Sequence, residues 1–116
     1  MKEISEAQKA VFELMKFSSF NNFNAEQVIN DLIENRSLWR NCMLDRADLI
    51  KIRDLHKNRF NADTLYIFTT GVNDDRMEYI ARSWNPDEVG YLSDDDTRHA
   101  IGMSHPDIKV LFVWWD

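Results

Sequence analysis

The last apolar stretch of the chain, residues 108–115, constrains the fold most strongly. It is the most hydrophobic window in the sequence, is rich in β-branched and aromatic residues, and follows the turn signal His105-Pro106-Asp107. Such a run predicts a strand that is buried on both faces. A buried strand needs hydrogen-bonding neighbours, and residues 64–70 form the only other window of the same kind. The two stretches are therefore expected to share a sheet.

Two helices are predicted at the start of the chain. Ser5 and Gln8 have the spacing of a capping box, in which Gln8 reaches back to the start of a helix over residues 5–17. Asn24 repeats this capping logic ahead of a second helix over about residues 25–35, which has one apolar face. The short connector indicates that the two helices pack as neighbours.

The next two segments are harder to assign. A short third helix is predicted from residue 37, because Trp39, Cys42 and Met43 would share one helical face. Residues 45–57 favour a helix over a strand, because Asp45 could cap a helix and Ala, Leu, Lys and Arg have high helix propensity. The margin is narrow, because the apolar residues scatter around a helical wheel and Ile50 and Ile52 alternate as in a strand.

The second half of the chain contains one open alternative and one clear helix. Residues 76–84 fit either a helix capped by Asn73 or the second arm of a hairpin, because nine residues satisfy both periodicities. Ser93, followed by three aspartates, predicts the start of a last helix over about residues 94–102, with Gly102 as its stop.

The expected fold class is α+β in a single domain, residues 1–116. Two or three N-terminal helices would pack on a small sheet formed mainly by residues 64–70 and 108–115. The alternative is an α/β two-layer unit, in which helices at 76–84 and 94–102 cross between two parallel strands. Adjacent tryptophans at the end of the last strand should face opposite ways, so one enters the core while the other faces a helix or a partner chain, which is compatible with a homodimer.

Charge is unevenly distributed along the chain. Residues 1–60 carry ten Lys/Arg against nine Asp/Glu, a net of +1, whereas residues 61–116 carry four against eleven, a net of −7. Cys42 is the only cysteine, and neither an apolar signal core nor a run of about 18 apolar residues is present. A cytoplasmic location without membrane insertion is expected. The uneven charge of the two halves of the chain bears on the partners of the protein rather than on its fold.

The acidic second half suggests a protein-binding surface. Aromatic side chains among carboxylates are typical of a site for a basic protein, where charge steers the encounter and rings supply contact energy. We expect a small acidic module, of the inhibitor or immunity type, that blocks a basic or nucleic-acid-processing partner. The predicted contact residues are Asp74, Asp75, Trp84, Asp87, Glu88 and Tyr91.

Two other functions are kept as alternatives. Asp95, His99 and His105 could hold a divalent metal in a metal-dependent hydrolase, because Asp95 and His99 lie one helical turn apart. The basic segment 36–59 could follow a nucleic-acid backbone, although the net charge of −6 disfavours this. No glycine-rich phosphate loop or other cofactor motif is present, so no cofactor is expected.

Overall fold

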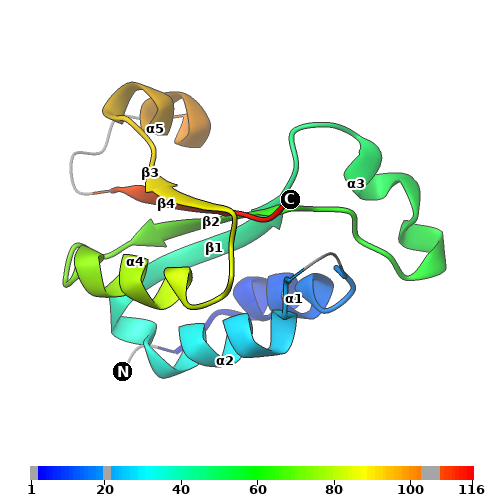
Figure 1. The fold of residues 1–116 in the computed structure, drawn as a ribbon, viewed down its shortest axis with the longest axis horizontal. Coiled ribbons are helices and arrows are strands. Elements are labelled where there is room, and N and C mark those ends of the chain that lie inside the picture. The colour runs from blue at the N-terminus through cyan, green and yellow to red at the C-terminus, as the bar shows by residue number, and fades with distance from the viewer. Residues whose placement is uncertain (1–2, 20–21, 103–107) are drawn as a thin grey trace.

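The computed structural model describes residues 3–19, 22–102 and 108–116. Over this part of the chain, five α-helices and two short 3-10 helices accompany a four-stranded antiparallel sheet, which is an α+β fold (Figure 1). The elements in chain order are α1 (Glu6–Met15), α2 (Ala25–Glu34), η1 (Arg36–Leu38), β1 (Trp39–Asp45), α3 (Ile50–Arg53), η2 (Leu55–Lys57), β2 (Thr64–Thr69), α4 (Asp74–Arg82), β3 (Glu88–Tyr91), α5 (Asp94–Ile101) and β4 (Val110–Trp114). None of the helices in the described ranges is long and apolar enough to cross a membrane.

The two apolar stretches form the centre of the sheet, as predicted. The strand order is β1-β2-β4-β3, and every neighbouring pair is antiparallel. In the central pair, Ile67 lies opposite Leu111, and both side chains are fully buried. The prediction that residues 64–70 and 108–115 share a sheet is therefore confirmed.

The α/β alternative is wrong, although both of its helices exist. Asn73 caps α4 by accepting a hydrogen bond from the backbone N–H of Arg76, which settles residues 76–84 as helix rather than hairpin. Ser93 caps α5 in the same way through the N–H of Asp96. However, β2 and β4, the two strands that this alternative makes parallel, run antiparallel. Helix α4 instead crosses over between β2 and β3, which are parallel to each other because β4 lies between them and runs antiparallel to both.

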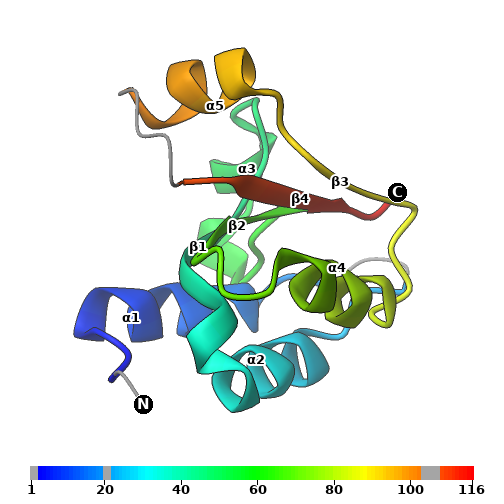
Figure 2. The same ribbon diagram turned by 90° about the vertical axis from the view of Figure 1, so that its left-hand side faces the viewer.

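Helices α1, α2 and α4 cover one face of the sheet, and α5 lies on the opposite side (Figure 2). The covered face holds the main core, which includes Leu65, Val113 and Trp115. Trp115 is fully buried, whereas Trp114 is only partly buried and pairs across the sheet with Thr64. The alternation expected for these adjacent tryptophans is therefore present.

The short helix predicted from residue 37 is wrong beyond its first turn. After the 3-10 turn η1, the chain continues as the strand β1, in which Trp39, Cys42 and Leu44 are buried. The register between β1 and β2 shifts between Trp39 and Asn41, which marks a bulge. The extra residue brings Trp39 and Cys42 onto the same face although they are three positions apart, so the bulge imitates helical spacing.

The capping box at the start of α1 forms only in part. Ser5 accepts a hydrogen bond from the backbone N–H of Gln8, as predicted. The side chain of Gln8 does not reach back to the helix start. It is buried, and its amide bonds instead to the backbone of Cys42 in β1, where its Oε1 accepts from the N–H and its Nε2 donates to the carbonyl, both at 2.9 Å.

Residues 45–57 form helical turns but not the continuous helix that was predicted. Only α3 and η2 are helical, and neither contains a buried residue. The physical reason is that the apolar side chains of this segment do not form one face that could pack on the core. Four of them remain exposed: Leu49, Ile50, Ile52 and Leu55.

Candidate functional site

Carboxylates of helix α4 gather around Tyr91 at the end of strand β3. The Tyr91 hydroxyl donates a 2.8 Å hydrogen bond to the backbone carbonyl of Asp74, which ties the start of α4 to the strand. Burial raises the pKa of Tyr91, and the nearby carboxylates of Asp74, Glu78 and Asp75 raise that pKa further. These side chains are therefore close enough to act on one hydroxyl group.

The cluster is poor in hydrogen-bond donors. The Oδ1 atom of Asp74 is buried and has no hydrogen-bond partner among the described residues, while its Oδ2 atom lies 3.9 Å from the Lys109 ammonium. Glu78 pairs with Arg82 at 2.8 Å. Asp75 is exposed and forms no ion pair with any residue in the described ranges. Negative charge at this end of α4 is thus only partly compensated.

Two more carboxylates stand at the start of β3. Asp87 and Glu88 are both exposed, and Asp87 accepts a 2.6 Å hydrogen bond from the backbone N–H of Asp116. Helix α4 contacts β3 directly, and Arg82 near its end reaches the carbonyl of Val89. From Asp74 to Tyr91 the chain holds five carboxylates against two arginines, a net of −3. We refer to Asp74, Asp75, Glu78, Asp87 and Glu88 as the α4–β3 acidic surface.

Trp84 does not belong to this surface. It is only 1% exposed, and its indole N–H donates to a carboxylate oxygen of Asp31 at 2.8 Å. Its backbone carbonyl accepts a hydrogen bond from the indole of Trp115. The ring is part of the core, so of the two predicted aromatic residues only the partly buried Tyr91 lies near the carboxylates.

The residues of the predicted metal site are only partly described. Asp95 and His99 both lie on α5 and are exposed, whereas His105 lies outside the described residues. A ring nitrogen of His99 lies 2.8 Å from the backbone carbonyl of Asp95, and the Asp95 carboxylate pairs with Arg98. Within the described ranges, no group of three His, Cys, Asp or Glu residues is placed to hold a metal ion.

Four of the seven Lys and Arg side chains of the basic segment 36–59 are engaged within the protein, whereas Arg40, Lys57 and Arg59 are exposed and form no ion pair with a described residue. Arg36 stacks over the ring of Trp39 at 4.2 Å and donates to the Trp39 carbonyl at 2.6 Å, although its buried Nε atom has no partner within the described ranges. Trp39 is only 1% exposed, so its ring is not available to a base. The ion pairs in this segment are Arg46 with Asp48 and Asp63, Lys51 with Asp45, and Arg53 with Asp54. The segment therefore offers fewer unpaired cations to the phosphate groups of a nucleic acid than its composition suggests.

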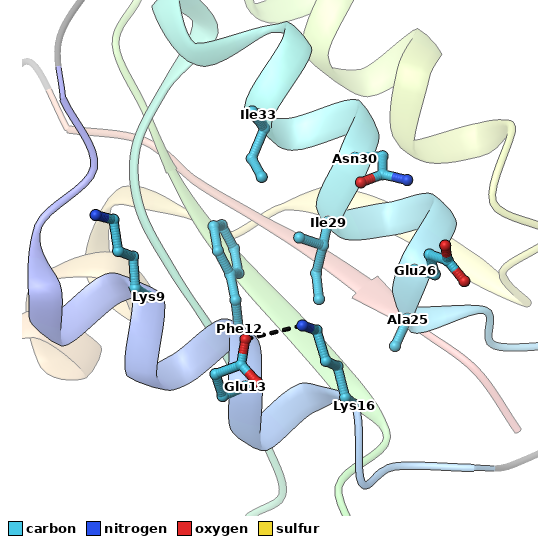
Figure 3. A pocket seen from close by; sticks show the side chains of 9 residues that line it. All are labelled: Lys9, Phe12, Glu13, Lys16, Ala25, Glu26, Ile29, Asn30 and Ile33. Carbon is cyan, nitrogen blue, oxygen red and sulfur yellow. Dashed lines mark hydrogen bonds and ion pairs between the residues drawn. The ribbon is translucent and has the colours of Figure 1, made fainter.

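The side chains that line two surface grooves do not indicate one class of ligand. One, of about 690 Å³, lies between α1 and α2, where Phe12 and Ile33 form its apolar floor (Figure 3). Its lining charges balance in number, since the two lysines Lys9 and Lys16 are matched by the two glutamates Glu13 and Glu26. Lys16 pairs with Glu13 at 2.8 Å. The other, of about 980 Å³, is lined by Glu34, Arg36, Ser37, Trp39, Arg40, Thr70 and Val72. Of its two arginines, Arg36 is already engaged and Arg40 is exposed.

Cys42 is buried and cannot act as a ready nucleophile. Burial raises its pKa to about 12, and this outweighs the opposing effects of the Gln8 hydrogen bond and the Arg36 charge. A thiol with such a pKa carries almost no thiolate at neutral pH, and the thiolate is the reactive form. Cys42 is therefore a core residue, as its position beside Trp39 in β1 also indicates.

Comparison of the chain with models of protein families, with curated proteins and with solved structures finds no match, so its function has to be inferred from its own residues.

Sequence reasoning did not identify strand β3 or the role of Gln8. The signal for β3 was the apolar stretch from Val89 to Leu92 between Pro86 and Ser93, which is too short to distinguish a strand from a loop by periodicity.

Proposed function

We propose that this protein is a small acidic binding module that engages a basic protein partner through the α4–β3 acidic surface. The observation that carries the proposal is the presence of five carboxylates on α4 and at the start of β3, beside one edge of the sheet, against only two arginines and Lys109. A nucleic-acid-processing enzyme has a basic substrate groove, so it is the kind of partner that an inhibitor or immunity-type protein of this charge would block.

The arrangement of the surface supports this function physically. Asp75, Asp87 and Glu88 are exposed and form no ion pairs within the described ranges, so their charges are available to lysine and arginine side chains of a partner. The hydrogen bond from Tyr91 to Asp74 holds α4 against β3, which fixes the spacing of the carboxylates before binding. Complementary charges of this kind mainly raise the association rate and select among partners.

A cytoplasmic location is part of the same proposal. It is supported by the single cysteine, since Cys42 is reduced and buried and the chain can form no internal disulfide.

The test is the association rate of a defined basic probe, a fluorescent peptide of about ten residues in which arginine and threonine alternate. The test variant carries Asp75→Asn, Asp87→Asn and Glu88→Gln. The matched control carries Glu6→Gln, Glu13→Gln and Glu26→Gln, which remove three exposed charges from α1 and α2. Both variants have the same net charge.

Neutralising the acidic surface should slow association much more than the control does. A unit charge pair about 10 Å apart in water contributes about 0.4 kcal/mol. Three such pairs contribute about 1.2 kcal/mol, which corresponds to roughly an eightfold slower association at low salt. The difference between the variants should shrink as the ionic strength rises from about 0.01 M to about 0.15 M. Equal rates for the two variants, or rates that do not respond to salt, would refute the proposal.

A further inference from the structure

The two edges of the sheet differ in whether their backbone groups are satisfied. At β1, the amide of Gln8 bonds to both the N–H and the carbonyl of Cys42, as a neighbouring strand would. The guanidinium of Arg36 donates to the carbonyls of Trp39 and Arg40. Side chains therefore cover this edge from Trp39 to Cys42, which is a common protection against pairing with another chain.

The edge at β3 lacks such closure. Leu92 donates its N–H to the carbonyl of Val110, so the alternation of an antiparallel pair directs the backbone groups of Gly90 toward β4. The same alternation directs those of Val89 and Tyr91 outward. In the described part of the chain neither outward N–H has an acceptor, and the Val89 carbonyl receives only a 3.4 Å contact from Arg82. A row of backbone donors and acceptors is thus left open.

We infer that the basic partner binds by adding an extended segment to β3 as a fifth strand. This inference rests on the proposed function and specifies how the partner is held. Charge complementarity supports a basic segment, because carboxylates lie at both ends of the open edge. Asp74, Asp75 and Glu78 lie near its Tyr91 end, and Asp87 and Glu88 lie at its start. Main-chain hydrogen bonds would provide affinity, and the carboxylates would select a cationic sequence.

The position of α4 predicts which residues of the segment are cationic. The side chains of Val89 and Tyr91 pack toward the core, on the same side of the sheet as α4, whereas α5 lies on the other side (Figure 2). A residue of the added strand that lies beside either of them directs its side chain toward α4. Every second residue of the segment therefore faces the α4 carboxylates and should be lysine or arginine.

The test compares the alternating arginine–threonine peptide with a form that is N-methylated at every second residue. Methylation keeps the charges but removes the backbone donors that would face β3. We expect it to weaken binding by at least about tenfold, which corresponds to the loss of two hydrogen bonds. Amide hydrogen exchange of the wild-type protein should also slow by at least about tenfold at Val89 and Tyr91 when the unmodified peptide saturates it.

The outcomes separate this inference from the function on which it rests. If both peptides bind equally well in a salt-dependent manner and the two amides stay unprotected, strand addition is wrong but the acidic surface still binds basic segments. If neither peptide binds, both proposals are wrong. Because the exchange measurement uses the unaltered protein, it does not depend on a variant that fails to fold.

Arg82 provides a second test, since an added strand must displace it from the Val89 carbonyl. The variants are made in a Glu78→Gln background, because Arg82 also pairs with Glu78 and its loss would otherwise free a carboxylate. In that background Arg82→Ala should tighten binding of the unmodified peptide by severalfold. Arg76→Ala is the matched control, because it removes the same charge from α4 at a side chain that lies over Tyr79. Strand addition predicts a larger gain for Arg82→Ala than for Arg76→Ala. Equal gains would show that charge alone is responsible and would overturn the inference.

Discussion

The hydrogen bonds of Gln8 to strand β1 give a prediction that can be worked from the structure. Gln8 is 6% exposed, and its amide satisfies the N–H and the carbonyl of Cys42 at 2.9 Å each. Gln8→Ala leaves two backbone groups of the edge strand without partners, and each such group costs about 1–3 kcal/mol when it is buried. Alanine recovers a few tenths of a kcal/mol through its higher helix propensity.

We therefore expect Gln8→Ala to lower the free energy of unfolding by about 2–4 kcal/mol. Urea denaturation monitored by tryptophan fluorescence measures this change. The matched control is Gln27→Ala, because Gln27 is exposed on α2 and its side chain has no hydrogen-bond partner among the described residues. A cost below about 0.5 kcal/mol for Gln8→Ala, similar to that of a surface substitution, would refute the argument that this amide closes the edge.

Gln8→Glu adds a pH dependence with a defined sign. The ionised carboxylate that this substitution introduces still accepts from the Cys42 N–H but faces the Cys42 carbonyl with no donor. Burial and this repulsion raise the folded pKa of the new carboxyl group above the unfolded value of about 4.3. The stability deficit of Gln8→Glu relative to the wild type should therefore be small below about pH 4 and grow as the pH rises. A deficit that is constant with pH would contradict the proposed geometry.

Buried groups give three further predictions. Because burial raises the pKa of Cys42 to about 12, iodoacetamide at pH 8 should label it only after the protein is unfolded, as mass spectrometry would show. The pKa of Tyr91 is raised by burial and then by α4 carboxylates, so the stability it contributes is lost as the pH rises above about 10. Glu78→Gln should lower that pKa in an NMR titration, and an unchanged value would place the carboxylate elsewhere. Trp84→Phe removes the hydrogen bond to Asp31 and should lower the free energy of unfolding by about 1–3 kcal/mol in urea.

The central pairing of the sheet could be predicted because its strands are long and almost wholly apolar. β2 and β4 have no competing helical pattern, and their burial leaves little choice of partner. The helix caps at Ser5, Asn24 and Ser93 could also be predicted from the sequence. Each of these side chains accepts a hydrogen bond from the backbone N–H three residues ahead. Local chemistry determines these features, so one sequence is enough to find them.

Features that depend on distant contacts could not be predicted. The bulge in β1 disturbs the strand period, so Trp39 and Cys42 show helical spacing in the sequence. The role of Gln8 depends on a residue 34 positions away, and nothing near Gln8 indicates that its amide is needed there. A local capping pattern pointed to the helix start instead.

The candidate surface was predictable in charge but not in geometry. Carboxylates at Asp75 and Glu88 were visible as an acidic stretch, yet their common neighbour, the open edge of β3, appears only once the strand order is known. Trp84 was expected among them because it lies between them in the sequence. Trp84 instead lies two residues beyond the end of α4, and its ring is part of the core together with Ile80.

Capture of partners from an extract of the cell that makes this protein tests the central claim most directly. Three baits are needed: the wild type, the α4–β3 variant with Asp75→Asn, Asp87→Asn and Glu88→Gln, and the control with three neutralised glutamates on α1 and α2. The acidic-surface account predicts a basic protein, identified by mass, that the wild type and the control retain and the α4–β3 variant loses. The same basic protein on all three baits would contradict the account.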